Sequence, residues 1–533
     1  MTNSLRASSF RGSATAVAGL WLVIASTAIA QSGESRLVHF APDGSRKLVY
    51  QPYDDQGDTI PDFSNCGYMG GGVRLPDVST RLTIYPDPSG RDDTQRIQAA
   101  IRRVESMQPS REGIRGTLRL AAGVYRVSGI LHVTEGGVVL RGDGASENGT
   151  VIFATGTLQR PLIDISGRQG VREVSDTEQT ITDSYVPVGA HSMSIADASG
   201  FRVGDTVYVV RHGNAAWIHT LKMDEMIARS GTRQWEPFDI DSDRVITAID
   251  GNRITVDAPI CCSIDTQWGG GSVVKIADPG RIQQCGVEDI LAISAYNPAV
   301  HARLGGVVYE SDEKHALDAI SLDNCKNCWV RRVVAMHFYN GVAKMERDAK
   351  WVTVEDSRSL DPVSIIVGGR RYPFCIMGQL DLVQRCYSRN GRHAFVVNGG
   401  HLAGPDVFLN CQSELDHADS GPHQRWSTGT LYDDVHGVLH TQDREDMGSG
   451  HGYAGANDVY WNCTGNIIVQ APPTAQNFSI GFIGHIDKPA FAFLDHPVGY
   501  TESFGEHVEP MSLYLQQLRD RLGAKAVENI AQP

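Results

Sequence analysis

The sequence predicts an all-β solenoid with an inserted antiparallel β module and short capping helices. Three observations support this fold class. Short strands of alternating apolar and polar residues recur from about residue 285 onward. The chain is rich in glycine, with 56, while only 21% of its residues are charged, as is typical of a turn-rich β protein. The rhythm of the repeats changes between about residues 175 and 262, where a separate module is expected.

The recurring strands define the repeat. We take Val330, Val352, Val383, Phe408 and Tyr460 as equivalent positions, which gives steps of 22, 31, 25 and 52 residues, the last corresponding to about two turns. Repeats this short bury their apolar face only by stacking on their neighbours, which makes a solenoid. The strands are expected at residues 287–294, 328–336, 350–357, 380–388, 405–413 and 457–465.

Three of these units carry an Asn-Cys pair. Asn324, Asn410 and Asn462 each precede a cysteine, and we expect the asparagines to satisfy backbone groups at a bend rather than to act in catalysis. Ten cysteines are too few for a disulfide scaffold in so long a chain. Most are therefore expected to be buried thiols, with one or two disulfides left open.

Both ends of the solenoid are predicted to carry a helix. Residues 90–106 form an amphipathic helix with Asp92 or Asp93 as N-cap. Its apolar stripe comprises Ile97, Ala100 and Ile101. Residues 512–523 form a second helix that we expect to cover the open end of the stack. The stripe of this helix comprises Leu515, Leu518 and Leu522.

The chain divides into five predicted parts. The tip of the inserted module, with Trp217, His219 and Lys222, is expected to lean over a groove of the solenoid. The parts are a signal peptide at 1–30, an N-terminal cap with the first coils at 31–174, the β module at 175–262, the main β-helix with the groove at 263–487, and a C-terminal tail with its helix at 488–533.

The first residues predict export. Arg6 and Arg11 precede an apolar run, and Ala28-Ile29-Ala30 matches the small-x-small pattern of signal-peptidase sites. The run is short for a membrane span and no later segment is long and apolar enough, so no span is expected. The protein is therefore predicted to be secreted or periplasmic, with cleavage near Ala30.

Net charge restricts the partners. The chain carries a net charge of −14, and losing the two leader arginines makes it −16. An acidic surface excludes nucleic acid as a natural partner, since that would require a basic face. An anionic ligand must then be held by a local cluster of basic side chains.

Three segments resemble a known superfamily. The runs DDTQRIQAAI (92–101), GTLRLAAGVYRVSG (116–129) and VVLRGDG (138–144), followed by irregular coils, resemble the pectate-lyase superfamily of right-handed parallel β-helices. The resemblance implies extracellular action on polysaccharides, usually rich in uronic acids, by lyases or by hydrolases of the polygalacturonase type. It does not fix the reaction, because one fold hosts many sites.

Basic residues precede the strands of three successive coils. These are Arg371, Arg392 with His393, and Arg425. If the strands stack about 4.8 Å apart, the arginines form a ladder on one face that can bind successive carboxylates of a uronate chain. The further residues predicted to contact substrate are Arg389, His417, Trp426, Tyr453 and Trp217.

β-Elimination on a uronate requires three functions. A cationic cluster neutralises the carboxylate, a base removes the proton on C5, and an acid protonates the departing O4. The candidates are, in this order, Arg392 and Arg425, then His423 or His393, then Tyr432 or His451. The sequence therefore predicts a polysaccharide lyase acting on an acidic polysaccharide.

Two other functions stay open. Asp433-Asp434 followed by Gly450-His451-Gly452 resembles polygalacturonase motifs and suggests hydrolysis, although no Asn-Thr-Asp precedes the pair. A non-catalytic carbohydrate-binding protein would be expected to show stacked aromatic residues and few titratable groups. We expect a monomer.

No metal ligand set is predicted. Ca²⁺ is left open because many lyases of this fold use it, but the nearby acidic residues match no Ca²⁺ loop. Those residues are Glu414, Asp416, Asp419 and Asp443.

Overall fold

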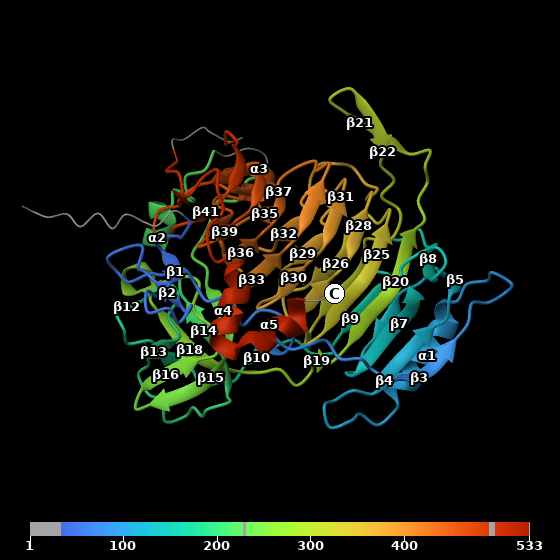
Figure 1. Ribbon diagram of the computed structural model, residues 1–533, viewed down its shortest axis with the longest axis horizontal. Coiled ribbons are helices and arrows are strands. Elements are labelled where there is room, and N and C mark those ends of the chain that lie inside the picture. The colour runs from blue at the N-terminus through green and yellow to red at the C-terminus, as the bar shows by residue number, and fades with distance from the viewer. Residues whose placement is uncertain (1–32, 228–230, 490–495, 532–533) are drawn as a thin grey trace, which may run out of the picture.

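The computed structural model describes residues 33–227, 231–489 and 496–531, so the predicted leader lies outside the described residues. The described chain forms a right-handed parallel β-helix, as predicted (Figure 1). Successive coils lie side by side along the long axis of the molecule. Their strands pair in parallel and build three long sheets.

The first sheet runs from the N-terminal to the C-terminal coils. Its strands are β3 (Thr80–Ile84), β4 (Gly116–Leu120), β7 (Val138–Gly144), β20 (Gly286–Ser294), β25 (Trp329–Met336), β27 (Thr353–Glu355), β30 (Leu382–Gln384), β33 (Ala403–Leu409), β36 (Ser427–Asp433), β39 (Val459–Trp461), β41 (Phe478–Ile480) and β43 (Tyr500–Glu502). Strands β20 and β25 are long and continue around the corner into the second sheet.

The second and third sheets complete each coil. The other strands of the second sheet are β5 (Gly123–Val127), β8 (Thr150–Ala154), β28 (Arg358–Leu360), β31 (Tyr387–Arg389), β34 (Gln412–Glu414), β37 (His436–Thr441), β40 (Thr464–Val469) and β42 (Ile483–Ile486). The strands of the third sheet are β6 (Leu131–Val133), β9 (Ile163–Ser166), β23 (Asp318–Asp323), β26 (Gly341–Met345), β29 (Phe374–Ile376), β32 (Phe395–Val397) and β35 (Gly421–Pro422).

The register corrects the predicted repeat. Val354, not Val352, pairs with Val330, because residues two apart in a strand face the same side and give the same pattern. The 52-residue step is two turns, as predicted, and Tyr432 of the intervening coil lies between Phe408 and Tyr460. Phe408, Tyr432 and Tyr460 stack with ring centroids 5.1 and 4.9 Å apart inside the helix.

The turn between the first and second sheets recurs in every central coil. Its corner residue adopts the left-handed conformation, with φ between 50° and 58°. The residues at this position are Asp289, Arg332, Asp356, Arg385, Asn410, Asp434 and Asn462. The predicted bend role of Asn410 and Asn462 agrees with this geometry, whereas Asn324 lies at another bend, between β23 and β24 (Cys325–Lys326).

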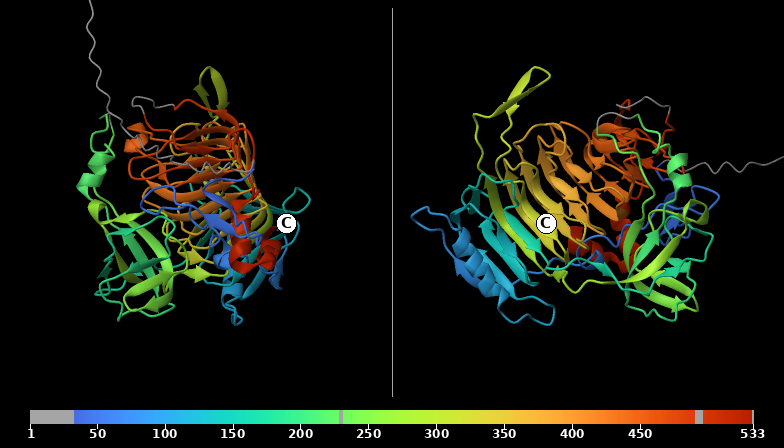
Figure 2. Two further views of the ribbon diagram at one scale, coloured as in Figure 1. Left: turned by 60° about the vertical axis from the view of Figure 1, so that its left-hand side comes forward. Right: turned by 180° about the vertical axis from the view of Figure 1, so that it is seen from behind.

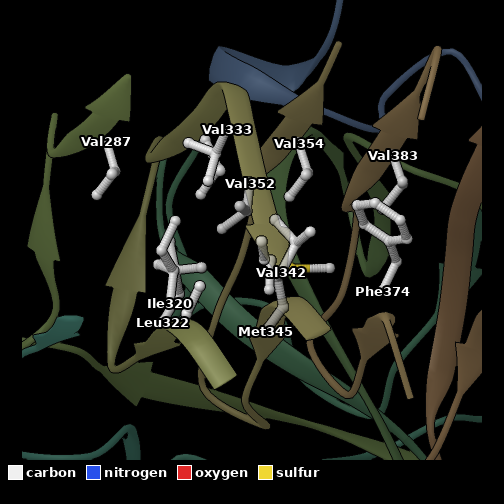
Figure 3. Close-up of a cluster of buried hydrophobic side chains, with 14 of the residues drawn as sticks. Val287, Ile320, Leu322, Val333, Val342, Met345, Val352, Val354, Phe374 and Val383 are labelled. Atoms are coloured by element: carbon white, nitrogen blue, oxygen red, sulfur yellow. The ribbon is translucent and has the colours of Figure 1, made fainter. Parts of the chain in front are cut away.

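The interior of the coils is apolar. Side chains from the third sheet, such as Leu322 and Phe374, point toward Val333, Val354 and Val383 of the facing strands (Figure 3). All ten cysteines are free and buried, which confirms the expectation of buried thiols. Burial at roughly 25 cal/mol per Å² of apolar surface, repeated in each coil, is the main source of stability.

An antiparallel module interrupts the stack after β9. Figure 2 shows it beside the coils, coloured green. Its strands extend beyond the predicted 175–262, from residue 172 to residue 277. Its main sheet contains β10 (Arg172–Glu173), β11 (Gln179–Thr180), β13 (Ser192–Ser194), β14 (Thr206–Arg211), β15 (Ile240–Asp250), β16 (Arg253–Val256) and β18 (Gly271–Ala277), and β12 (Tyr185–Val186) pairs with β17 (Ile264–Asp265).

Buried charges attach the module to the stack. The Asp243 carboxylate lies 2.6 Å from Lys350 Nζ and 2.8 Å from an Arg281 guanidinium nitrogen, and all three side chains are buried. Burial disfavours ionisation of Asp243, but the two cations hold its pKa below the usual value. The carboxylate therefore fixes the position of the module against the coil that contains Lys350.

The helices occupy two different places. α1 (Thr94–Glu105) begins after its N-cap Asp93 and buries the predicted stripe against the first coils. Contrary to our prediction, α4 (Leu513–Leu522) and α5 (Ala524–Ala531) do not cover the end of the stack. They pack on the outer face of the first sheet, where Leu518 belongs to a cluster with Leu382 and Val407. None of the described helices is long and apolar enough to cross a membrane.

Close packing between neighbouring strands gives a test of the register. Gly286 pairs directly with Trp329, and a Cβ at Gly286 would lie 2.3 Å from the fully buried indole. We expect Gly286→Ala to lower the free energy of unfolding by about 1–3 kcal/mol through overpacking. The midpoint of thermal unfolding measures this. Gly200→Ala, with nothing within 4 Å of its Cβ, is the control, and equal effects of the two substitutions would contradict the register.

Candidate active site

A groove of about 460 Å³ opens on the outer face of the third sheet. Lys344 and Cys375 lie in it because they alternate with core residues along β26 and β29. Tyr372 and Arg392 come from the turns that precede β29 and β32. His423, Gln424, Arg444 and His451 line the rest of the groove.

A tyrosine and a histidine form the centre of the groove. Tyr372 Oη lies 3.2 Å from His423 Nε2. An Arg444 guanidinium nitrogen lies 3.4 Å from His423 Nδ1. Since a guanidinium only donates, Nδ1 accepts, and the Nε2–H of neutral His423 then donates to the tyrosine oxygen. This leaves the phenolic hydrogen of Tyr372 free to point at a ligand.

Two guanidinium groups flank this pair. Arg392 lies 3.5 Å from Tyr372 Oη and donates to the carbonyl of Gly368. Arg444 is buried and pairs with Asp419 at 3.2 Å. Burial opposes ionisation of Asp419, yet Arg444 and two histidines keep its pKa below the usual value. Two cations and a single carboxylate leave this part of the groove positive within an acidic chain.

Three imidazoles lie next to one another at the groove. The ring of His423 is 4.6 Å from that of His393 and 4.8 Å from that of His451. Burial and the charges of Arg392 and Arg444 lower the pKa of His393 well below its ordinary value. Burial, followed by the neighbouring histidine and arginine charges, does the same for His423. Both imidazoles are therefore neutral near pH 7.

His451 has its proton on a defined nitrogen. Nδ1 lies 2.9 Å from the carbonyl of Met447, to which it donates, so Nε2 carries the lone pair. Burial lowers the pKa of His451 to about 3, with the charges of Arg444 and Arg425 adding to the effect. His393 has the same arrangement, because its Nδ1 contacts the carbonyl of Asp419, but its Nε2 is buried away from the groove lining.

A hairpin carries Arg444 and His451. Residues 443–453 form it, and the backbones of Arg444 and Gly452 are hydrogen-bonded to each other. The module packs on its outer side, where the Trp235 indole donates to the carbonyl of Gly450 at 3.1 Å. Gly452, with φ of 55°, has no room for a Cβ beside that indole. The module thus holds the hairpin against the groove.

The predicted ladder of arginines does not form. Arg371 and Arg392 are adjacent in neighbouring coils, but the Arg371 guanidinium is buried and donates to the carbonyl of Ser364 at 2.7 Å. Burial lowers its pKa to about 10. Arg425 lies in the turn between β35 and β36, next to Gly400, and its guanidinium donates to the carbonyl of Ser449 in the hairpin.

The remaining predicted contacts also lie outside the groove lining. Arg389 pairs with Asp361 at 2.5 Å, and the backbone N–H of His417 donates to Gly391. Tyr432 is in the coil core, fully buried, so it does not reach the groove.

The three aromatic candidates contribute packing. Trp217, in α2 (Ala215–Thr220), packs edge-on against Trp426 with ring centroids 5.1 Å apart, and both are buried. Tyr453 is buried in the same cluster. The module tip therefore packs against the stack and, contrary to the prediction, does not lean over the groove, because Trp217, His219 and Lys222 are absent from the groove lining. His219 is exposed and pairs with Asp224.

The carboxylates considered for hydrolysis or for Ca²⁺ binding do not line the groove. Asp433 is fully buried and accepts hydrogen bonds from Ser512 Oγ and the backbone N–H of Tyr514, at the start of α4. The Asp433-Asp434 pair therefore does not flank the groove. Within the described ranges no metal-binding group contains two of the four residues considered for Ca²⁺, namely Glu414, Asp416, Asp419 and Asp443.

Sequence reasoning missed Tyr372 and Arg444 as site residues. Tyr372 directly follows Arg370 and Arg371, and the sequence analysis assigned substrate binding to Arg371 and not to the tyrosine. Arg444 stands among acidic residues, in DREDM, and such a mixed run is typical of a solvated surface. Only the register of the coils reveals that Arg444 lies beside His423.

The buried pair of Arg444 and Asp419 supports a prediction on stability. Asp419→Asn leaves Arg444 without its counter-charge, which is expected to lower the free energy of unfolding by about 3–5 kcal/mol near neutral pH. Because the pKa of Asp419 is lowered by folding, this contribution is complete above the ordinary carboxyl pKa and is lost as the pH falls through the lowered value.

Thermal unfolding at several pH values measures the effect of Asp419→Asn. The solvent-screened surface pair of Arg91 and Asp87 provides a control, Asp87→Asn, which should change stability much less than Asp419→Asn. A loss at Asp419 no greater than that at Asp87 would contradict the assigned pairing.

Comparison with protein-family models and with curated proteins finds no match. Among solved structures, the chain is similar to the Gp54 tailspike of Acinetobacter baumannii bacteriophage AP22 (10% identity, TM-score 0.29, covering 79% of this chain and 73% of that one). It is similar to the tailspike protein of E. coli bacteriophage HK620 (12%, TM-score 0.32, 79% and 52%).

A third similar structure comes from Parabacteroides merdae and is described as a candidate glycosyl hydrolase (10%, TM-score 0.28, 62% and 95%). The AP22 and HK620 structures are complexes with a capsular saccharide and a pentasaccharide. At these identities and TM-scores the likenesses carry no argument about a reaction or a ligand.

Proposed function

We propose that the protein is an exported polysaccharide lyase that cleaves a uronic-acid-containing polysaccharide by β-elimination. The observation that carries the proposal is the meeting, in one groove, of the hydrogen-bonded Tyr372 and His423 with Arg392 and Arg444. Export is proposed from the leader at residues 1–30, and because the chain without it has a net charge of −16, a bound anion needs this local excess of cations.

In the proposed reaction, Arg392 and Arg444 bind the uronate carboxylate. Their charges stabilise the electron density that develops on the carboxylate as the C5 proton leaves, which acidifies that proton. Bidentate guanidinium–carboxylate contacts also fix the orientation of the sugar. Lys344 also lines the groove, but it is paired with Glu346 at 2.6 Å, so the two arginines are the proposed carboxylate ligands.

His451 is the proposed base and Tyr372 the proposed acid. The Nε2 lone pair of His451 takes the C5 proton, the C5–H electrons form the C4–C5 double bond, and the C4–O4 bond breaks. Tyr372 Oη–H protonates the departing O4, while His423 keeps the tyrosine oriented. Burial raises the pKa of Tyr372, with Arg392 opposing the rise, so the hydroxyl retains its proton until O4 needs it.

Hydrolysis is the less supported alternative. It requires two carboxyl groups on either side of the scissile bond. Among the described residues that line the groove, Asp318 is the sole carboxylic acid, and burial raises its pKa to about 7.

The activity test uses the full chain and a panel of uronate polymers. A lyase releases unsaturated uronates, which absorb in the ultraviolet, whereas a hydrolase produces new reducing ends without that absorbance. Binding without either product would support the carbohydrate-binding alternative instead. We expect ultraviolet absorbance to rise with at least one acidic polymer and not with neutral polysaccharides.

Substitutions then locate the reaction. Tyr372→Phe, which removes only the hydroxyl, and His451→Gln should each lower kcat by about 10²- to 10⁴-fold, the usual contribution of a general acid or base. Tyr432→Phe is the matched control, because its ring is in the coil core, and kcat should stay within about twofold. Far-UV circular dichroism reports folding. Full activity of Tyr372→Phe would remove this tyrosine from the mechanism.

The low pKa of His451 predicts two different pH profiles. In the free enzyme the imidazole is protonated only near pH 3, so kcat/KM should not fall between pH 7 and 5. A bound carboxylate would offset the arginine charges that help to lower this pKa, so the pKa should rise in the complex. We therefore expect the acid limb of the kcat profile at higher pH than that of kcat/KM. Coincident limbs near pH 6.5 would argue for an exposed histidine as base.

A further inference from the structure

We infer that the protein has a second, buried site that binds a divalent transition metal, with Zn²⁺ as the best-fitting ion. Its ligands are Asp443, Glu445 and His496, whose donor atoms lie within 4.8 Å of one another. The site lies at the base of the 443–453 hairpin, and none of its ligands lines the groove. It is thus distinct from the groups assigned to catalysis.

The donor atoms are buried and lack hydrogen bonds. Asp443 Oδ2, Glu445 Oε1 and His496 Nε2 make no well-aligned hydrogen bond to any described residue, although His496 Nε2 lies within ion-pair distance of both carboxylates. The side chains of Asp443, Glu445 and His496 are only 0%, 6% and 7% exposed. Burying an unsatisfied carboxylate oxygen costs about 1–3 kcal/mol or more, so two such oxygens beside one buried imidazole nitrogen indicate a missing partner with positive charge.

Two separations between donor atoms fit tetrahedral coordination, and the two carboxylate oxygens lie within 4.8 Å of each other. His496 Nε2 lies 3.2 Å from Asp443 Oδ2 and 3.5 Å from Glu445 Oε1. Ligands bound at about 2.0–2.1 Å in a tetrahedron lie roughly 3.3–3.4 Å apart. Two carboxylates and an imidazole suit Zn²⁺ or a neighbouring metal, whereas Ca²⁺ prefers oxygen ligands alone.

The groups around the ligands are arranged as in metal sites. His496 Nδ1 lies 3.1 Å from Tyr453 Oη, so the ring can donate there and present Nε2 to a metal. Asp443 Oδ1 accepts from the backbone N–H of Glu445 at 2.8 Å, which leaves Oδ2 for coordination. The backbone N–H of Asp443 donates to Gln470 Oε1, fixing the position of that residue.

The site would control the shape of the groove. Arg444 lies between the ligands Asp443 and Glu445 in the chain, and its side chain reaches the opposite side of the hairpin to contact His423. A metal that fixes the backbone at 443 and 445 therefore also fixes the direction of Arg444. His496 is far along the chain, so the ion would cross-link the hairpin to the C-terminal segment.

Metal binding is tested on the full chain after treatment with EDTA. We expect added Zn²⁺ to bind with a stoichiometry of one per chain in calorimetry and to raise the midpoint of thermal unfolding. Asp443→Asn and His496→Gln should abolish both effects. Tyr453→Phe should weaken Zn²⁺ binding by about 10- to 100-fold, as expected for a residue that orients a ligand. These readouts do not depend on polysaccharide cleavage, so they stand apart from the proposed function.

The exposed group of His219, Asp224 and Glu225 provides the matched control. His219→Gln should leave Zn²⁺ binding unchanged. Co²⁺ added to the EDTA-treated wild type gives a readout that does not require a variant to fold. Visible bands of tetrahedral Co²⁺ without a thiolate charge-transfer band are expected. Absence of Zn²⁺ binding, binding that survives His496→Gln, loss of binding in His219→Gln, or a thiolate band would each overturn the proposal.

Discussion

The pairing of each coil with the next is the constraint on which the rest of the structure depends. A coil has one apolar side and strands with open edges, and both are satisfied only by its neighbours. The pairing fixes the register, as in the run from Val330 through Val354 and Val383. Every side chain outside the core is then positioned too, since a slip of one residue would turn core residues outward. Tyr372 and His423, 51 residues apart, meet for this reason.

The hairpin at 443–453 joins three parts of the molecule. Its inner side presents Arg444 and His451 to the groove, its outer side packs on Trp235 of the module, and Asp443 and Glu445 lie at its base. Alone, a loop with several glycines would lose much conformational entropy on ordering. Packing on the module offsets this loss, which gives the inserted module a physical role in shaping the groove.

The fold was largely predictable from sequence, and the candidate site only partly. Alternation and the recurrent Asn-Cys pairs indicated stacked coils, and α1 followed from its apolar stripe and Asp93. Periodicity of two cannot distinguish Val352 from Val354, so the register was wrong there, whereas the two-turn step correctly predicted the coil that contains Tyr432. Three histidines, His393, His423 and His451, were identified and do lie together. Sequence patterns alone could not show that Arg444, and not Arg425, faces the groove. This depends on where each strand ends and which strand it pairs with, and no local pattern contains that information.

The electrostatics of the groove connect these features to the proposed chemistry. Three imidazoles remain neutral because they are buried among guanidinium groups, and Asp419 offsets only part of that charge. Such an arrangement is unfavourable by itself, since like charges are held together at reduced solvation. A bound carboxylate would supply the missing counter-charge, strengthen its own binding, and raise the basicity of His451 at the same time. The same interaction between the carboxylate and the arginines would then both bind the substrate and make His451 a stronger base, and a neutral sugar could not provide it.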